Sequence, residues 1–251
     1  MGSLTDKLSK INHIATLVIV AALWAPNLSS GILSQRYGTM GDERLKVCDP
    51  AMPLDTESKE KLLSRIKNTQ AGTEILNEYI EKYGSFDTLV VQWDSVSYSQ
   101  LSKKLDRVPA GQSKNSNTAV VCIHLSKKLP EIEHVADLVH ELVHASRLSQ
   151  KVLLGEEMAP DEFVQSRIAG RGGEADAFRV ECAVKHEILG YWDNLCRPYV
   201  RSPAGVDEKT VVDDLYSGTL SASLTGEAYP IMLAKQYKRM LERRSFNGIL
   251  K

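Results

Sequence analysis

The segment His140-Glu141-Leu142-Val143-His144 combines residue types that can carry out metal chemistry with a spacing that suits a helix. Residues four apart lie on one face of a helix, so both imidazoles can bind one metal ion. Glu141 follows the first histidine and can reach a water molecule on that metal. Zinc would act as a Lewis acid and lower the pKa of the water, and the glutamate would take the proton as general base. The pattern predicts a zinc hydrolase. The alternative is an amphipathic helix with two surface histidines and a solvated glutamate.

The residues around the motif predict the helix that has to carry it. Pro130 stands where a first-turn proline is tolerated, and Glu131 and Glu133 suit the positive end of a helix. Five apolar residues recur at helical spacing and would bury one stripe against a core, namely Val135, Leu138, Leu142, Ala145 and Leu148.

A catalytic zinc also needs a third protein ligand. Gly172 and Gly173 break the chain before a run of helix formers, and Glu174 opens that run, so we predict Glu174 as this ligand. Glu181 is the rival, on nearly the same helical face but about 10 Å further along. It could instead support a ligand from behind or be solvated. Asp137, three residues before His140, is a second candidate for such a supporting contact to a histidine.

The motif followed by Glu174-Ala175-Asp176-Ala177-Phe178 resembles the gluzincin arrangement of zincin metallopeptidases, in which Glu-x-x-Ala carries the third ligand. It is similar to small one-domain bacterial metallopeptidases, including anti-repressor-type and effector-type proteases, over residues 118–190. The resemblance implies a zincin-like fold and one Zn²⁺ per chain on His140, His144 and Glu174, with Glu141 as base. It also implies a protein or peptide substrate that adds to a strand edge formed by residues 118–125.

Two other functions stay open. One is a zinc-binding module of zincin fold without proteolytic activity, and the other is a zinc amidohydrolase that acts on a non-peptide amide. The side chain that stabilises the oxyanion is also left open. Its downstream candidates are His186, Tyr191, Tyr199, Tyr216, Tyr229 and Tyr237.

The first 31 residues differ from the rest of the chain. Lys7 and Lys10 precede an apolar run from Ile14 to Ala25, which is short for a membrane span and typical of a signal peptide. The segment is either cleaved after Gly31 or retained as a membrane anchor, so we expect an exported or anchored protein. A cytosolic amphipathic helix is the weaker alternative, because the apolar run has no polar face. The net charge of −1 with mixed signs gives no reason to expect a nucleic-acid partner, and nothing indicates an oligomeric state.

The four cysteines allow two disulfides in an oxidising compartment. Cys182 and Cys196 are the expected pair, because a helix end and a turn separate them. Cys122 lies in an apolar run, where a buried free thiol is expected.

The remaining pattern predicts an α+β fold with a small sheet. Residues 32–56 read as a linker, and residues 57–251 as one catalytic domain. A helix capped by Thr56 or Ser58, with a possible break at Gly72, precedes strands at 88–93 and 118–123 that flank a polar loop at 109–117. The motif helix and further helices follow. The last of these has a basic face at 235–244 and packs through Ile231, Leu233, Met240 and Leu241.

Overall fold

The computed structural model describes residues 54–94, 97–103, 119–127, 129–153, 156, 158–203, 205–220 and 228–249. The predicted signal or anchor segment, the loop at 109–117 and most of the predicted linker lie outside these residues. The last linker residues belong to the folded part, because the buried Leu54 donates its amide to the Val91 carbonyl at 2.6 Å. Within the described ranges, no helix combines the length and the apolar character that crossing a membrane requires.

The main sheet has three strands, β1 (Leu89–Asp94), β2 (Tyr98–Lys103) and β3 (Ala119–Ser126), in the order β1-β3-β2. β1 pairs with β3 in parallel and β2 pairs with β3 antiparallel. The two predicted strands are confirmed. β2 was not predicted, because its sequence YSQLSK lacks an apolar alternation.

The prediction that residues 118–125 form the free edge of this sheet is wrong. β3 is the central strand and is paired on both sides. Among the described strands, β1 and β2 form the two edges, so a peptide that adds to the sheet would meet one of them rather than β3.

The first two helices are α3 (Thr56–Lys67) and α4 (Gln70–Tyr83), and the chain breaks between them at Asn68 and Thr69 rather than at Gly72. The side chain of Thr69 caps α4. Gly72 instead permits close packing, because a Cβ there would lie 2.2 Å from the Ile66 carbonyl oxygen. The cap of α3 is Asp55, whose carboxylate accepts the Ser58 amide at 2.8 Å, and not Thr56 or Ser58.

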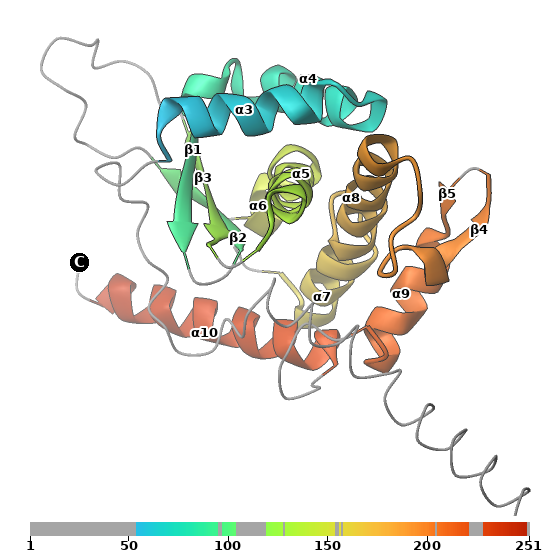
Figure 1. Cartoon of the computed structure of the whole chain (residues 1–251). Coiled ribbons are helices and arrows are strands. Elements are labelled where there is room, and N and C mark those ends of the chain that lie inside the picture. Colours follow the sequence, from blue (N-terminus) through green and yellow to red (C-terminus); the bar gives the residue numbers. More distant parts are fainter. Residues whose placement is uncertain are drawn as a thin grey trace, which may run out of the picture.

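The motif helix α5 (Glu131–Arg147) lies between the sheet and α8 (Glu174–Leu189), with α3 and α4 along one side (Figure 1). All five residues of the predicted apolar stripe are buried. The opposite faces of the helix are buried too, since every residue from 135 to 145 is buried. The polar residues of the motif are therefore enclosed and are not surface residues, which argues against the simple amphipathic alternative.

Four further helices share a second core with α8. They are α6 (Gln150–Leu153), α7 (Pro160–Ile168), α9 (Glu208–Ser217) and α10 (Tyr229–Ile249). Short 3-10 helices occur at Phe86–Thr88 and Arg197–Tyr199. A hairpin of β4 (Val200–Ser202) and β5 (Gly205–Val206) interrupts the helices that were predicted to continue to the C-terminus. The described residues form mostly helices with two small sheets, which is compatible with the predicted α+β class. In α10, Leu233 is buried as predicted, whereas Ile231 is 52% exposed and does not pack as predicted.

The cysteines follow the prediction in one case and contradict it in the other. Cys182 and Cys196 form a disulfide that joins α8 to the turn after it. Cys122 is buried but is not a free thiol, because it is disulfide-bonded as well. Its apolar surroundings in β3 predicted the burial correctly but contain no information about a distant partner.

Candidate metal centre

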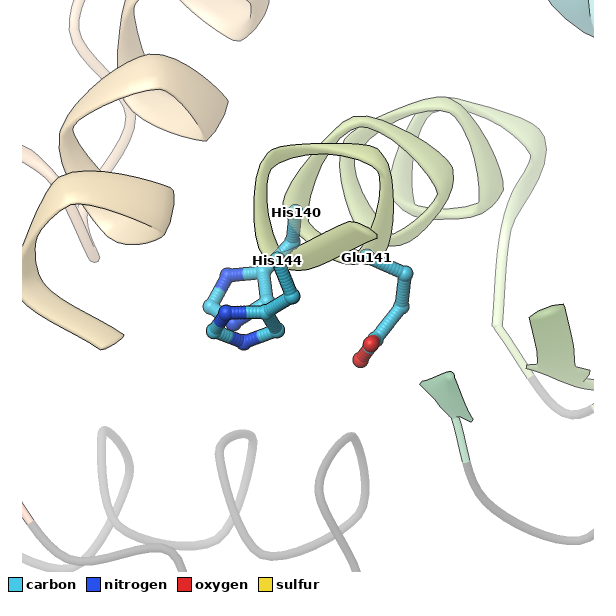
Figure 2. A group of neighbouring side chains, drawn as sticks. All are labelled: His140, Glu141 and His144. Atoms are coloured by element: carbon cyan, nitrogen blue, oxygen red, sulfur yellow. The ribbon is translucent and has the colours of Figure 1, made fainter. Parts of the chain in front are cut away.

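The two motif histidines project side by side from α5, with Glu141 on the neighbouring part of the same helix (Figure 2). Their ring centroids lie 4.7 Å apart, as expected for residues one helical turn apart. One ligand atom from each of His140, Glu141 and His144 can be chosen so that all lie within 4.8 Å of one another, and all three residues are buried. This group could hold a metal ion.

Glu174 meets the histidines from the first turn of α8. One of its carboxylate oxygens lies 3.2 Å from Nε2 of His140, and the other lies 3.5 Å from Nε2 of His144. Its position depends on the two glycines before it. Gly172 has a φ of +78°, and a Cβ at Gly173 would lie within 2.9 Å of three carbonyl oxygens. The predicted glycine break is thus present, and the turn that it forms places the start of α8 next to both imidazoles.

The other ring nitrogens of the two histidines each have a separate partner. Nδ1 of His144 donates to the Gly172 carbonyl at 2.7 Å, and Nδ1 of His140 pairs with Glu181 at 3.1 Å. A carbonyl can only accept, so Nδ1 of His144 carries a proton, and Nε2 is the ring nitrogen that faces Glu174. Metal-binding histidines are commonly oriented in this way.

This arrangement separates the two glutamates that the sequence left as rivals. Glu174 faces the Nε2 side of both rings, whereas the fully buried Glu181 contacts the Nδ1 side of His140. Asp137, the other candidate for a supporting contact, is fully buried and accepts a hydrogen bond from Ser97 on the side of the sheet.

The charges within this group are strongly coupled. Burial opposes a charge on His140, but the hydrogen bonds to Glu174 and Glu181 outweigh it and raise the pKa of this imidazole to about 10. Burial also opposes the charge on Glu174. His144, His140 and Arg167 outweigh that effect and hold the pKa of the Glu174 carboxyl well below its usual range. The carboxylate is therefore ionised, as a cation ligand must be.

Arg167 and Tyr229 complete the surroundings of Glu174. The Arg167 guanidinium donates to one carboxylate oxygen at 3.1 Å, and the Tyr229 hydroxyl lies 3.4 Å from the other. Burial, together with the charges of Glu174 and Glu141, raises the pKa of the Tyr229 phenol well above its usual value. The hydroxyl thus remains a hydrogen-bond donor beside the group.

Only Tyr229 among the six oxyanion candidates contacts the group through a described interaction. Tyr237 donates to the Met158 carbonyl, and Tyr199 packs against Phe178. His186 stacks on Trp192, about 18 Å along α8 from Glu174 at 1.5 Å per residue. The last two, Tyr191 and Tyr216, are exposed.

Sequence reasoning missed the other contacts of Glu174 and His144. Nothing in the spacing of Arg167 or Tyr229 marks them, because Arg167 reaches Glu174 across the glycine turn between α7 and α8, and Tyr229 lies 55 residues further along the chain. The Gly172 carbonyl had a local signal in the glycine pair, which indicated a close approach but not its target.

The donor set suits zinc. Two imidazole nitrogens and one carboxylate are donors that zinc accepts, and the outer ring nitrogens are held by Glu181 and Gly172, as is common for metal-binding histidines. Family models, curated proteins and solved structures were all compared with this chain, and none matches it.

Proposed function

We propose that the chain is a zinc-dependent metallopeptidase of gluzincin type, in which His140, His144 and Glu174 hold one zinc ion. The observation that carries the proposal is the approach of both Nε2 atoms to one carboxylate, at 3.2 and 3.5 Å. Three such ligands leave one position open, as catalytic zinc requires. When bound, zinc supplies Lewis-acid activation of water and of the substrate carbonyl.

Glu141 serves as the general base. Its side chain projects from α5 one residue after His140 and is only 4% exposed. A carboxylate oxygen lies within 4.8 Å of a ring nitrogen of each histidine. The carboxylate takes a proton from the attacking water and passes it to the amine that leaves. A purely structural metal site would have no need of a buried carboxylate beside the histidines, so Glu141 favours an enzyme over a binding module.

Tyr229 serves as the hydrogen-bond donor to the carbonyl oxygen of the substrate. Its buried hydroxyl lies 3.4 Å from a carboxylate oxygen of Glu174, beside the two histidines that this carboxylate contacts. As the carbonyl carbon is attacked, negative charge builds up on its oxygen, and a donor already in place stabilises that charge.

The substrate peptide lies along β2 in this proposal. β2 packs against α5 and has an outer edge without a neighbour among the described strands. An extended peptide could add to this edge through backbone hydrogen bonds. This assigns to β2 the role that the sequence resemblance gave to residues 118–125.

We also propose that the protein is exported or anchored outside the cytosol. The Cys182–Cys196 disulfide and the disulfide bonding of Cys122 support an oxidising compartment. Secretion by a host that processes signal peptides tests this. A mature chain that begins near Ile32 supports cleavage, Met1 in the membrane fraction supports an anchor, and Met1 in the cytosol contradicts both.

The proposed activity is tested by metal analysis followed by digestion of a broad peptide library. We expect one zinc per chain and cleavage that stops with a chelator, returns with zinc, and is absent in Glu141→Gln. Zinc binding without any peptide cleavage would favour a binding module or a non-peptide amide as substrate. Failure of the purified protein to take up zinc would refute the proposal.

A further inference from the structure

Arg147 forms a nearly enclosed ion cluster just behind the motif. It lies three residues after His144 on α5, and its side chain is 11% exposed. The guanidinium donates to both carboxylate oxygens of Glu78 on α4, at 2.7 and 2.9 Å. A third nitrogen donates to both oxygens of Asp176 on α8, at 2.9 and 3.1 Å. Such two-point contacts fix direction as well as distance.

Asp176 connects this cluster to the metal centre through the backbone of Gly172. One Asp176 oxygen accepts the Gly172 amide at 2.9 Å. The carbonyl of the same glycine accepts Nδ1–H of His144 at 2.7 Å. Gly172 is therefore held on its amide side by the carboxylate, while its carbonyl holds the imidazole.

Only glycine fits at this point of the turn. A Cβ on Gly172 would lie 2.5 Å from the Leu148 amide nitrogen and 2.6 Å from the Arg147 Cβ, and the φ of +78° is unfavourable for other residues. The turn thus lies directly against the end of α5. Its orientation is set by contacts to that helix and to Asp176.

We propose that Asp176, oriented by Arg147, is a positioning residue that holds the Gly172 carbonyl on His144. The inference rests on the proposed function, because its purpose is to keep Nε2 of His144 directed at the metal. The competing explanation is that the cluster only ties α4, α5 and α8 together. Both explanations predict lower stability when the cluster is broken, so stability alone does not separate them.

Two variants break the cluster on opposite sides of Arg147. Asp176→Asn keeps the shape of the side chain but removes its charge and leaves one acceptor oxygen for three donors, which are the Gly172 amide and the guanidinium groups of Arg147 and Arg179. Glu78→Gln weakens Arg147 on the α4 side and leaves the contacts of Asp176 in place. Zinc affinity is measured by chelator competition with the full chain, well below the melting temperature of each variant by circular dichroism. The absorption spectrum of bound Co²⁺ reports the ligand geometry.

We expect Asp176→Asn to weaken zinc binding about 10-fold, the lower end of the effect of losing a direct partner of a metal ligand, because Asp176 acts on His144 through Gly172, and to change the Co²⁺ spectrum. Glu78→Gln should lower the melting temperature but leave the zinc affinity and the Co²⁺ spectrum unchanged. Wild-type zinc affinity in folded Asp176→Asn, or equal losses in both variants, would overturn the inference. If Asp176→Asn does not fold, Asp176→Glu, which moves the carboxylate by one methylene, is judged by the same criteria. Absence of zinc binding in the wild type would instead refute the proposed function.

Discussion

Replacement of Glu174 and of Glu181 by alanine should have different effects on zinc binding, because the two carboxylates contact opposite sides of the imidazoles. Glu174 lies on the Nε2 side of both rings, at 3.2 and 3.5 Å. Glu181 lies on the Nδ1 side of His140 alone, at 3.1 Å. The first substitution removes a proposed ligand, and the second removes a partner of a ligand.

The magnitudes follow from these positions. Loss of a partner behind a metal ligand costs about 10- to 100-fold in affinity, which corresponds to about 1.4 to 2.7 kcal/mol. We expect Glu181→Ala to fall in this range. Glu174→Ala leaves two histidine ligands and should exceed it, with loss of turnover. Glu181→Gln is the matched control, because its amide oxygen still accepts from Nδ1 of His140, and it should bind zinc better than Glu181→Ala.

Folding has to be measured beside affinity. Removal of one partner of a buried ion pair costs about 3 to 5 kcal/mol of stability, and Glu174 contacts His140, His144 and Arg167. The assay is therefore zinc titration against a competing chelator, with circular dichroism of each variant at the same temperature. If folded Glu181→Ala loses zinc while Glu174→Ala retains it, Glu181 is the ligand and the assignment of both carboxylates is wrong.

Three further predictions concern the base, the donor and the disulfide. Glu141→Gln should keep zinc and lower turnover by about 10² to 10⁴, and loss of the metal in this variant would show that Glu141 is not simply the base. Tyr229→Phe should keep zinc and lower kcat by about 10² to 10³ with little change in KM, whereas an unchanged kcat would exclude the hydroxyl from catalysis. Replacement of Cys182 and Cys196 by serine opens a loop with a sequence separation of 14 and should cost about 3 kcal/mol of stability. Denaturant unfolding measures this cost, and an unchanged midpoint would show that the disulfide does not constrain the chain.

Local patterns predicted the elements whose structure depends on near neighbours. The α5 helix, its buried stripe and the start of α8 at Glu174 were predicted from apolar spacing, proline and glycine. The break near Gly72 was misplaced for a physical reason. The sequence shows a glycine but does not show that its missing side chain makes room for the Ile66 carbonyl.

Long-range pairing was beyond the reach of these patterns. β2 was missed, and β3 was taken for an edge, because strand order depends on which strands meet rather than on the composition of any one strand. The prediction that Cys122 is a free thiol was wrong for the same reason, whereas the Cys182–Cys196 pair, which is close in sequence, was predicted correctly.

The sequence alone determined that His140, Glu141 and His144 share one region of a helix, because a spacing of four residues fixes that relation wherever the helix lies. It also placed Glu174 at the start of a second helix. Only the tertiary structure decided that Glu174 of this helix faces both Nε2 atoms and that Glu181 lies behind His140. It also decided that Tyr229 of α10 lies beside Glu174. Those relations depend on the packing of α8 and α10 against the buried α5, and contacts between helices distant in sequence leave no periodic signal in the chain.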